Sequence, residues 1–399
     1  MKDKKIILGV CGGIAAYKAA ELVRLYVKAG AVVFVVMTDS ARQFVSPLTF
    51  QTLSGNPVHW EVFSLIQEQE IGHISLADRA DLLVVAPATA NVIGKVAAGI
   101  ADDLLTTTIM ATKAPILFVP AMNSNMWENP IYQQNQRKLQ DGGCHFMEPA
   151  VGMLACGWEG KGKLPDPEAI LAETQRLLAP RDLAGETLLV TAGPTREELD
   201  PVRFLSNYSS GKMGYAIARA AARRGARVLL VSGPTALPVP GGVEFYPVVS
   251  ACQMRQKVME LAPVCTVVIK AAAVADYRPV RRSEQKIKKS TGDTITLELE
   301  RNPDILGELG RLPGKRLLVG FAAETEALLE NARRKLREKN LDLIVANDVT
   351  REGAGFDLDT NIVRLLYRNG EVEDFPCMGK DQVAGHLLNR IIKLKGTSR

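Results

Sequence analysis

The chain has 399 residues, which is too long for one ordinary hydrophobic core, so we expect two domains. Hydrophobic residues make up 47% of it, no apolar run approaches the ~20 residues that span a bilayer, and the six cysteines show neither a CxxC pair nor a regular spacing. We therefore exclude a disordered protein, a membrane-spanning protein, a disulfide scaffold and a cysteine-rich zinc site, and the net charge of +5 is too small and dispersed to indicate nucleic-acid binding.

The chain begins MKDKKIILGVCGG, where charged residues lead directly into a predicted strand. This segment has no hydrophobic signal-peptide region, so we expect a cytoplasmic protein. Strand-like apolar runs then alternate with helical periodicity, and a helix over residues 14–28 stops at Gly30. The strands are predicted over residues 5–11, 32–37, 81–86, 115–119 and 144–147. This alternation predicts a parallel sheet with helices on both faces.

A second α/β series follows a predicted linker between Leu178 and Glu186, where a proline, charges and a glycine interrupt the pattern. Its strands are predicted over residues 187–191, 228–231, 266–271, 317–321 and 341–346, its helices over 213–224 and 380–395, and a hairpin over 362–375 around Asn369-Gly370. The expected fold is α/β, with two Rossmann-like domains at residues 1–180 and 181–399. The basic excess lies in the second domain and suits a polyphosphate ligand.

The first candidate site is GVCGGIAAYK, residues 9–18, which predicts a strand, a glycine-rich turn and the start of a helix. Free N–H groups at such a helix N-terminus bind phosphate well. Only a fragment of the GxGxxG pattern is present, so tight packing of the turn is an alternative. Asp39, after the second strand, could resemble the ribose-binding acid of an NAD site.

Polar side chains also surround the predicted strand at 81–86. His73 and Ser75 precede it in GHISLADRAD, although a lone histidine is more often structural than catalytic. Thr89, Asn91, Lys95 and the threonines at 106–108 follow it. Hydroxyls and amides at the carboxyl end of a strand suit a phosphate or the edge of a heteroaromatic ring. Helix capping by Thr89 and Asn91 is the alternative.

The segment PAMNSNMW, residues 120–127, places Asn123 and Asn125 among methionines and a tryptophan after a predicted strand. An amide flanked by apolar groups can orient a polar ligand in a partly dry pocket. The following GMLACGWEGKGK, residues 152–163, is rich enough in glycine to form a flap. Its Cys156 lies near Lys161 and Lys163, and nearby positive charge can lower the pKa of a thiol.

The second half carries three further motifs. SSGKMG, residues 209–214, resembles a phosphate loop but lacks the Walker A pattern, and a serine-capped helix is the alternative. KAAAVADYRP, residues 270–279, ends a strand with small residues that let a flat base approach the backbone, and Asp276 is its only acid. KIKK, residues 286–289, is typical of a solvated edge. Lys335 and Lys339 share a helix face and repel each other unless an anion lies between them.

These motifs follow one another in a characteristic order. GGIAAYK, GHISLAD, APATAN, PAMNSNMW and the LACG flap resemble the homo-oligomeric flavin-containing cysteine decarboxylases. NYSSGKMG, AAVADYRP, KIKK, NPDIL and GFAAET resemble a CTP-dependent ligase. As an ordered set over nearly the whole chain, they resemble the bifunctional enzymes of coenzyme A biosynthesis, in which phosphopantothenoylcysteine decarboxylase precedes phosphopantothenate–cysteine ligase. The resemblance implies a flavodoxin-like flavoprotein in the first half and a ligase domain with a β-hairpin in the second.

The activity implied by the resemblance has two steps. CTP activates 4′-phosphopantothenate as an acyl-cytidylate, with Mg²⁺, and L-cysteine displaces CMP. FMN then assists the oxidation of the thiol to a thioaldehyde, the loss of CO₂ to give an enethiolate, and reduction to 4′-phosphopantetheine. The partners are thus small molecules, with no nucleic acid and no membrane. The implied assembly is a dodecamer built from trimers of the flavin half, with FMN at subunit contacts, and dimers of the ligase half.

The resemblance also implies residue roles. His73 is the base, Asn123 holds the substrate carboxylate, Cys156 donates a proton and Asn207 binds the acyl-cytidylate. The implied FMN site comprises Gly12, Gly13, Ile14, Thr38, Pro87, Thr89, Asn91 and Thr107. The implied CTP site comprises Ala271, Ala272 and Ala273 at the base, with Asp276, Lys286, Asn302, Pro303, Asp304, Ile305, Phe321, Lys335 and Lys339. No Mg²⁺ ligands are implied.

The chain departs from the family pattern at two places. The flap continues GKGKLPDP where an Arg-Met-Glu version is usual, so that Lys163 and Asp166 are conservative replacements. Arg301 precedes NPDIL where a lysine is usual. Two other functions compatible with this sequence are an NAD(P)-dependent reductase with two Rossmann-like halves and a non-catalytic, flavin-binding regulatory protein. An FMN spectrum would exclude the reductase, and the presence of both His73 and Cys156 disfavours the regulator.

Overall fold

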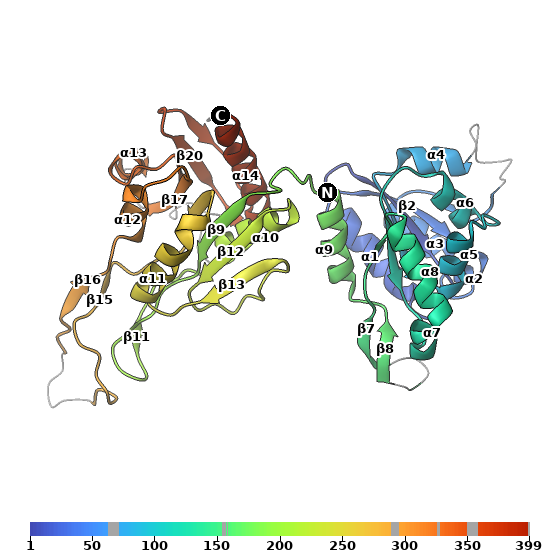
Figure 1. Ribbon diagram of the computed structural model, residues 1–399, viewed down its shortest axis with the longest axis horizontal. Helices are drawn as coiled ribbons and strands as arrows, with labels where there is room; N and C mark the ends of the chain where they lie inside the picture. Colours follow the sequence, from blue (N-terminus) through green and yellow to red (C-terminus); the bar gives the residue numbers. More distant parts are fainter. Residues whose placement is uncertain are drawn as a thin grey trace. The chain divides into compact units, whose positions relative to one another are not determined.

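The computed structural model describes residues 1–62, 72–153, 157, 159–288, 295–324, 328–348 and 358–397. The chain divides into two compact units, Met1–Ala179 and Pro180–Arg399, each of which is a sheet flanked by helices (Figure 1). The α/β fold class predicted from the sequence is therefore confirmed. Within the described ranges, no helix has the length and apolar character needed to traverse a lipid bilayer.

The first unit contains a six-stranded parallel sheet with the order β3-β2-β1-β4-β5-β6. Its strands are β1 (Lys5–Val10), β2 (Val32–Met37), β3 (Val58–His59), β4 (Leu82–Ala88), β5 (Ile116–Pro120) and β6 (His145–Phe146). This order is that of the Rossmann fold and differs from the 2-1-3-4-5 order of flavodoxin. The expected Rossmann-like sheet is therefore confirmed, and the short β3 beyond β2 is the strand by which its order differs from that of flavodoxin.

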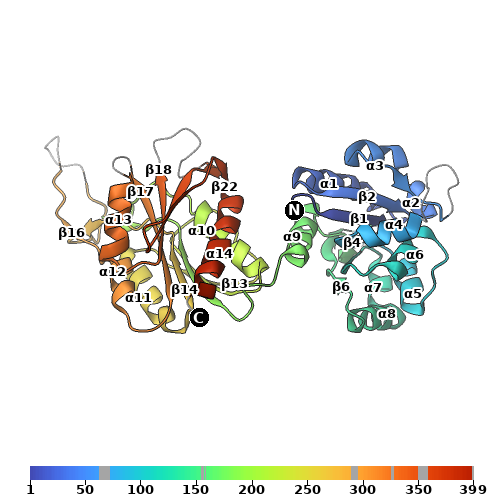
Figure 2. The same ribbon diagram turned by 90° about the horizontal axis from the view of Figure 1, so that it is seen from above.

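Helices cover both faces of this sheet (Figure 2). One face packs against α1 (Ala16–Lys28), α3 (Pro47–Ser54) and α9 (Pro167–Leu178), and the other against α4 (Gly72–Arg79), α5 (Ala90–Ala98), α6 (Leu104–Ala111) and α8 (Pro130–Asp141). Along β1, Ile6 and Leu8 enter the first core and Ile7 enters the second. Because both faces are buried, the strands are continuous apolar runs rather than alternating ones.

Three short elements complete the first unit. The helices α2 (Asp39–Arg42) and α7 (Ser124–Glu128) follow β2 and β5 directly. The antiparallel hairpin of β7 (Ala150–Met153) and β8 (Glu159–Lys163) follows β6 and leads back to α9. These elements therefore lie at or near the carboxyl ends of the strands, where ligands bind in open α/β sheets.

The second unit contains an eight-stranded sheet with the order β13-β12-β9-β14-β17-β18-β20-β21. Its strands are β9 (Thr187–Ala192), β12 (Arg227–Ser232), β13 (Val243–Pro247), β14 (Val267–Lys270), β17 (Leu317–Glu324), β18 (Leu343–Asp348), β20 (Val363–Tyr367) and β21 (Val372–Asp374). The first six in the spatial order are parallel, and β20 and β21 are antiparallel. The predicted hairpin around Asn369-Gly370 is present as β20–β21, with Gly370 at φ +91°.

Helices cover both faces of this sheet (Figure 2). On one face lie α10 (Lys212–Arg223) and α14 (Lys380–Thr397), and on the other α11 (Ala251–Leu261), α12 (Ile305–Arg311) and α13 (Leu328–Glu338), with a 3-10 turn at Ala262–Val264. Each face has its own apolar core, so the strands of this unit are also buried on both sides.

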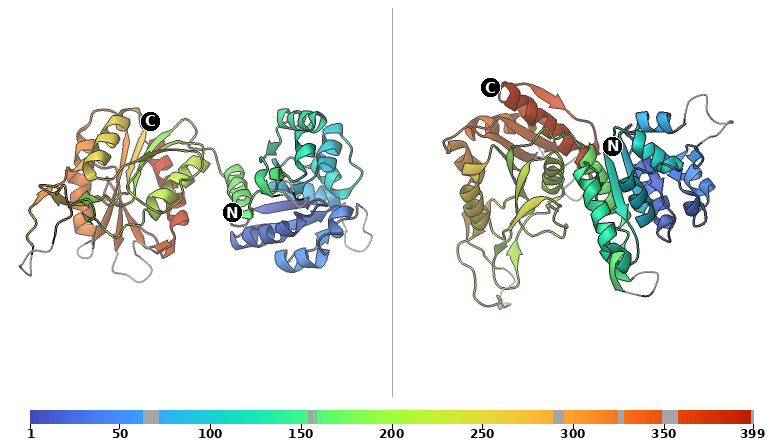
Figure 3. Two further views of the ribbon diagram at one scale, coloured as in Figure 1. Left: turned by 90° about the horizontal axis from the view of Figure 1, so that it is seen from below. Right: turned by 45° about the vertical axis from the view of Figure 1, so that its right-hand side comes forward.

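Short strand pairs project from or border this sheet. The pair β15 (Tyr277–Pro279) and β16 (Leu299–Arg301) forms an arm that extends away from the main sheet (Figure 3). The pair β10 (Glu197–Glu198) and β11 (Phe204–Leu205) lies beside its base, and β19 (Thr360–Asn361) pairs with β22 (Met378–Gly379) before α14. The arm carries part of KIKK, the motif expected to contact CTP.

Candidate active sites

The first candidate site is a cavity of about 560 Å³ at the carboxyl ends of β1, β4 and β5. It lies at the point where the strand order reverses, between β1 and β4. Its walls are Gly12, Gly13, Ile14, Ala15, Tyr17, Lys18, Pro87, Thr89, Ala90, Asn91, Ala121, Met122, Asn123, Met126, Met153, Gly162, Lys163 and Leu164. The cavity thus brings together six residues of the expected FMN site with Asn123, from three separate loops.

The turn after β1 has two different glycine environments. A Cβ at Gly12 would lie 2.7 Å from the carbonyl carbon of Ser40, so this glycine permits close packing against the loop after β2. A Cβ at Gly13 would meet nothing within 4 Å, so Gly13 faces open space. Tight packing of the turn, the alternative interpretation of this motif, therefore applies to Gly12, and phosphate binding stays a prediction.

The cavity has the size and chemistry to hold a flavin nucleotide. Its volume lies within the range typical of small-molecule sites. The N-cap residue Ala15 makes no side-chain hydrogen bond to the first turn of α1, which leaves this helix N-terminus suited to a phosphate. Ile14 and Tyr17 are each 61% exposed and Met153 is 65% exposed, so apolar groups that water now contacts could cover a flat ring.

Thr89 and Asn123 both line the cavity, and each also caps the N-terminus of a helix. Thr89 is the N-cap of α5 and accepts a hydrogen bond from the backbone N–H of Val92 at 3.4 Å. It also hydrogen-bonds with Cys11, but burial dominates and raises the pKa of this thiol to about 12. Asn123 is the N-cap of α7 and accepts from the N–H of Asn125 at 2.9 Å. The raised pKa makes Cys11 unsuited to act as a nucleophile. The hydrogen bond to Asn125 holds the Asn123 side chain at the wall of the cavity.

The β7–β8 hairpin fits tightly against the Asn123 loop. A Cβ at Gly160 would lie 2.4 Å from Ser124 Oγ, and a Cβ at Gly162 would lie 2.1 Å from the carbonyl oxygen of Met122. Met122 donates its N–H to the carbonyl of Gly162 at 3.0 Å. The two glycines thus allow the base of the hairpin to form one side of the cavity.

Three predicted residues of the first half are not among the described residues that line this cavity. Thr38 caps α2 by accepting from Ala41 at 3.3 Å, and Thr107 donates to the carbonyl of Asp103 at 2.7 Å. His73 lies on α4, and its Nδ1 is buried without a hydrogen-bond partner. Cys156, together with most of the flap tip, falls outside the described residues.

The two family departures in the flap segment have different environments. Lys163, the last residue of β8, lines the cavity. Asp166 is the N-cap position of α9, and its carboxylate lies 3.6 Å from the ammonium of Lys18, which also lines the cavity. A positive charge therefore remains at the wall despite the changed sequence.

The second candidate site lies where the order of the second sheet reverses, between β9 and β14. The loops after these strands bond to each other: Thr195 N–H donates to Ala273 O at 3.2 Å, and Ala273 N–H donates to Gly193 O at 3.0 Å. The side-chain amide of Asn207 also donates to Ala273 O, at 2.6 Å, while its oxygen accepts from Ser209 N–H at 3.0 Å. Asn207 therefore fixes the SSGKMG loop against the small residues expected to hold the base.

A cavity of about 130 Å³ lies beside this junction. Its walls are Ser209, Gly211, Lys212, Met213, Gly214, Ala271, Ala272, Ala273, Phe321, Ala322, Asn347, Asn361 and Lys380. The N-cap position of α10 is Gly211, at φ +78°, and no side chain caps the helix. The serine-capped alternative is thus not observed at the N-cap, and the N-terminus of α10 borders the cavity.

Three buried polar residues of this cavity were not predicted from the sequence. Asn347, Asn361 and Lys380 are only 8%, 4% and 7% exposed. The side-chain oxygen of Asn347 is buried and has no hydrogen-bond partner. Asn347 directly follows the strand predicted at 341–346. Ligands bind at the carboxyl ends of such strands, so this position could have marked Asn347 as a candidate site residue. Lys380 and Asn361 carry no such signal.

Charged residues of the expected CTP site gather beside α12. Lys339 donates to the carboxylate of Asp304 at 2.9 Å, and Asp304 caps α12 by accepting from Gly307 N–H at 3.1 Å. Burial, and then the charge of Lys339, lowers the pKa of Lys270 to about 8, with Lys335 acting in the same direction and Asp276 opposing it. The fold therefore brings four residues of the expected CTP site close to the side chain of Lys270, which was not predicted as a site residue. These four are Lys335, Lys339, Asp276 and Asp304.

The NPDIL turn is tied to the loop after β14. Asn302 bonds to this loop through both its backbone and its side chain. Its backbone N–H donates to Asp276 O at 2.8 Å, and its side-chain amide donates to Ala275 O at 2.8 Å. Arg278 in turn donates to Arg301 O and to the Asn302 side chain, each at 3.1 Å. The backbone of Arg301, where the chain departs from the family's lysine, is thus part of this junction.

Lys286 is exposed on the arm, and no described contact joins it to the other expected CTP residues. The adjacent Ile287 N–H donates to the buried carboxylate of Asp200 at 3.1 Å. Burial opposes ionisation of Asp200, but bonds from Ile287, Val202 and Arg203 lower its pKa below the usual value. Asp200 therefore anchors the segment that carries Lys286.

A larger cavity, of about 790 Å³, lies beyond β12 and β13 and contains none of the predicted site residues. Three of its polar side chains have partners within the protein: Thr235 donates to Tyr215 OH at 3.1 Å, Ser232 to Gly233 O at 2.8 Å, and Lys257 pairs with Glu260 at 2.6 Å. Among the described residues, no group of three or more histidines, cysteines or carboxylates could hold a metal ion.

Both units are α/β sheets with a cavity at the switch point of the strand order, which is the architecture of nucleotide-binding enzymes. Residues 1–179 match the family described as "Flavoprotein", and residues 183–394 match "DNA/pantothenate metabolism flavoprotein C-terminal domain". The class indicated is a flavoprotein domain joined to a nucleotide-dependent ligase domain.

Relatives of known function align with nearly the whole chain. The chain is 50% identical to the coenzyme A biosynthesis bifunctional protein CoaBC of Bacillus subtilis over 99% of its length and 98% of the relative. It is 48% identical to the protein of that description from Vibrio cholerae, over 98% of each. A crystal structure of the C-terminal domain of CoaBC is 46% identical, covers 54% of this chain and 99% of that one, and has a TM-score of 0.48.

The chain belongs to the CoaBC family of bifunctional coenzyme A biosynthesis proteins. It is accordingly a bifunctional enzyme, with decarboxylase and ligase activities that carry out two steps of coenzyme A biosynthesis. The resemblance identified from the ordered motifs is confirmed.

Proposed function

We propose that residues 1–180 form an FMN-dependent phosphopantothenoylcysteine decarboxylase. The supporting observation is the cavity at the β1–β4 switch point, which combines an uncapped N-terminus of α1 with exposed apolar groups and the Asn123 amide. The bound flavin would supply the electron sink that a simple N-acylcysteine lacks, and would later return the electrons. The unit therefore has the groups needed to bind a flavin and a carboxylate together.

In this proposal, Asn123 orients the substrate carboxylate through its amide, without a positive charge that would hold CO₂ back. Met122 and Met126 at the same wall reduce the access of water. Cys156 protonates the enethiolate that remains after CO₂ has left the thioaldehyde, and reduction then gives 4′-phosphopantetheine. The roles of Asn123 and Cys156 are thus separate in time.

His73 is proposed to act as the base that removes a proton from the substrate. Its buried Nδ1 has no hydrogen-bond partner within the described part of the chain, and His73 is not among the described wall residues of the cavity. A trimer with FMN at the subunit contacts accounts for both facts, because a neighbouring copy would supply the histidine. The trimer and the dodecamer built from it are part of this proposal.

We further propose that residues 181–399 catalyse the CTP-dependent ligation. A carboxylate oxygen of 4′-phosphopantothenate forms a bond to the α-phosphorus of CTP, and the bond from that phosphorus to the bridging oxygen breaks, so that pyrophosphate leaves with the electron pair. The amine of L-cysteine then attacks the acyl carbon and CMP departs. Asn207, which is fixed by Ala273, would hold the acyl-cytidylate beside the N-terminus of α10.

The remaining elements of the proposal concern ions, assembly and location. Mg²⁺ would arrive with the triphosphate, since metal ions in such sites are commonly held by substrate phosphates and few carboxylates. Dimers of the ligase half would join the trimers into a dodecamer. The cytoplasmic location expected from the sequence is also retained in this proposal.

The test is to incubate the purified protein with 4′-phosphopantothenate, L-cysteine, CTP and Mg²⁺ and to detect 4′-phosphopantetheine by mass spectrometry. We expect a yellow protein with an FMN spectrum, formation of one CMP and one pyrophosphate for each amide, and little product with ATP. A colourless protein that consumes NADH would instead support a reductase. Equal use of CTP and ATP would contradict the proposed nucleotide specificity.

A further inference from the structure

The loop that is proposed to hold the cytosine base is tied to the end of β9 and the turn after it by three backbone N–H groups. We call residues 271–275 the base segment, because its first three residues form the proposed base contact. The donors are the N–H groups of Ala272, Ala273 and Ala275, and their acceptors, in the same order, are Thr191 Oγ1 at 3.1 Å, Gly193 O at 3.0 Å and Thr195 Oγ1 at 3.0 Å. Two of the three acceptors are thus threonine hydroxyls.

These two hydroxyls lie in the interior of the unit. Thr191 and Thr195 are both 0% exposed. A backbone N–H that is buried needs a partner within the protein, because water does not replace a partner that is removed. The loss of either hydroxyl would therefore leave a donor of the base segment unsatisfied, which costs more than the bond itself contributes.

Thr195 also joins the base segment to the loop that carries Asn207. The N–H of Thr195 donates to Ala273 O at 3.2 Å, and its carbonyl accepts from Ser206 Oγ at 2.8 Å. The side chain of Asn207, the next residue, donates to the same Ala273 O at 2.6 Å. Thr195 therefore sets the position of the base segment relative to Asn207, which is proposed to hold the acyl-cytidylate.

The same bonds decide which polar groups the base segment offers to a nucleotide. Each residue has one backbone N–H, and those of Ala272, Ala273 and Ala275 are already used within the protein. Cytosine carries an amino donor at the position where uracil carries the acceptor O4. A segment whose donors are engaged cannot pair with O4, so that uracil would be buried there with an unsatisfied oxygen. The arrangement therefore favours cytosine over uracil.

We propose that the hydroxyls of Thr191 and Thr195 are positioning groups that fix the base segment and keep its N–H donors from the base. This inference rests on the proposed CTP-dependent ligation and adds to it the origin of a preference for CTP over UTP. The two threonines act through Ala272 and Ala275 and do not touch the nucleotide themselves. Because the segment is held before the nucleotide arrives, binding requires little further ordering of the loop.

The experiment measures pyrophosphate release by the full-length protein with 4′-phosphopantothenate, L-cysteine, Mg²⁺ and either CTP or UTP. Thr195→Val removes one hydroxyl at nearly constant shape, Thr195→Ser keeps it, and Thr191→Val removes the other. Thr266→Val is the matched control, because Thr266 directly precedes β14 and its hydroxyl accepts from Thr187 N–H at 3.2 Å. Circular dichroism melting establishes that each variant is folded.

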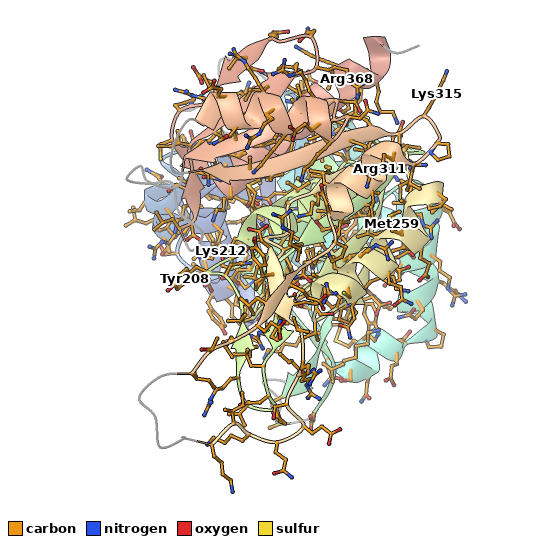
Figure 4. The ribbon with its side chains drawn as sticks, turned by 90° about the vertical axis from the view of Figure 1, so that its left-hand side faces the viewer. Tyr208, Lys212, Met259, Arg311, Lys315 and Arg368 are labelled. Carbon is orange, nitrogen blue, oxygen red and sulfur yellow. The ribbon has the colours of Figure 1, made fainter. Side chains whose placement is uncertain are left out.

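The control position lies at the other end of the strand that leads into the base segment. Leu317, the first residue of β17, donates its N–H to Thr266 O at 3.0 Å. Lys315, two residues before Leu317, lies on the side of the unit opposite Tyr208 and Lys212 (Figure 4). Thr266→Val thus removes a comparable bond far from the proposed ligase site.

We expect Thr195→Val to lower kcat/KM for CTP about tenfold, as for a buried donor left unsatisfied, and to narrow the preference for CTP over UTP at least about threefold. Thr191→Val should act in the same direction, and Thr195→Ser should restore most of the activity and the preference. Thr266→Val should lower the melting temperature without changing the preference. Decarboxylation of supplied phosphopantothenoylcysteine should be unchanged in all four variants.

Hydrogen exchange followed by mass spectrometry tests the same inference in the wild-type protein. Because three N–H groups of the base segment are bonded within the protein, peptides that contain residues 271–275 should exchange slowly before any nucleotide is added. Rapid exchange that slows only when CTP binds would overturn the inference, and this test applies even if neither valine variant folds.

The kinetic outcomes separate the inference from the function on which it rests. Folded Thr195→Val and Thr191→Val proteins with wild-type kcat/KM and wild-type nucleotide preference overturn the inference. Wild-type protein that uses CTP and UTP equally well also overturns it, while it leaves the ligation in place. Wild-type protein that releases pyrophosphate from neither nucleotide overturns the proposed ligation together with the inference.

Discussion

Lys339 donates a hydrogen bond from Nζ to the carboxylate of Asp304 at 2.9 Å. Burial opposes ionisation of Asp304, but the bonds from Lys339 and Gly307 lower its pKa below the usual range. The pair joins the end of α13 to the N-cap of α12, two segments that the sequence assigned separately to a nucleotide site. The lysine thus has a structural partner in addition to any ligand.

Lys339→Met should weaken CTP binding more than it weakens the fold. The ion pair is partly exposed, with side-chain exposures of 25% and 53%, so its loss should cost less than about 1 kcal/mol of stability. The KM for CTP should rise about tenfold while kcat changes little, if Lys339 contacts the nucleotide in both ground and transition states. Steady-state kinetics and thermal melting, with Lys315→Met as the control, check this. An unchanged KM would show that Lys339 acts only through Asp304.

Lys270→Met should change the pH dependence of stability. Burial lowers the pKa of Lys270 in the folded protein to about 8, below the value of about 10.5 for an exposed lysine. Between these values the unfolded chain binds more protons, so the wild-type protein gains stability as the pH rises through 8 toward 10.5. The gain from this group amounts to about 3 kcal/mol at most.

The measurement is urea unfolding of both proteins between pH 7 and pH 10. Because other groups titrate in both proteins, the difference between the two curves isolates Lys270. We expect the advantage of Lys270→Met at pH 7 to shrink as the pH rises. A constant difference between the curves would contradict the lowered pKa.

Substitutions of Asn123 should separate its structural contact from its proposed catalytic one. Asn123→Asp keeps a good N-cap for α7 and should leave the melting temperature nearly unchanged, whereas Asn123→Ala should cost about 1 kcal/mol. Both variants should lose decarboxylation by about 100-fold or more, because the aspartate would repel the substrate carboxylate and the alanine cannot bind it. Assays of CO₂ release and thermal melting test this. An active Asn123→Asp enzyme would remove Asn123 from the carboxylate site.

Gly162→Ala should disturb the base of the hairpin and, with it, the first cavity. The added Cβ would lie 2.1 Å from the carbonyl oxygen of Met122, a backbone atom that cannot rotate away. We expect a loss of about 1–3 kcal/mol, as for other overpacked sites, and a lower flavin content measured by visible absorbance. Gly385→Ala, within α14, is the control, because its Cβ would meet nothing within 4 Å and alanine favours a helix. Equal flavin content in the Gly162→Ala protein would show that the hairpin does not shape the flavin site.

The local pattern was sufficient for most of the sheet and helix elements. The strand predicted at 32–37 is β2, and the helix predicted at 14–28 is α1, which begins two residues later because Ile14 and Ala15 belong to the turn at the cavity. These elements are predictable because a strand buried on both faces needs an unbroken apolar run and a helix needs an apolar stripe. The family itself followed from the order of the motifs, which is also a property of the chain alone.

The sequence by itself determined the two α/β units and the motifs whose residues line the first cavity, because each of these depends on neighbouring residues in the chain. Only the tertiary structure decided that Lys380 and Asn347 share a cavity with the SSGKMG loop, and that the half-buried Lys270 lies near the charges of Lys335, Lys339, Asp276 and Asp304. It also left His73 out of the described wall that contains Asn123. Such relationships depend on which strands become neighbours in a sheet, and strand order is set by the packing of the whole unit rather than by any one segment.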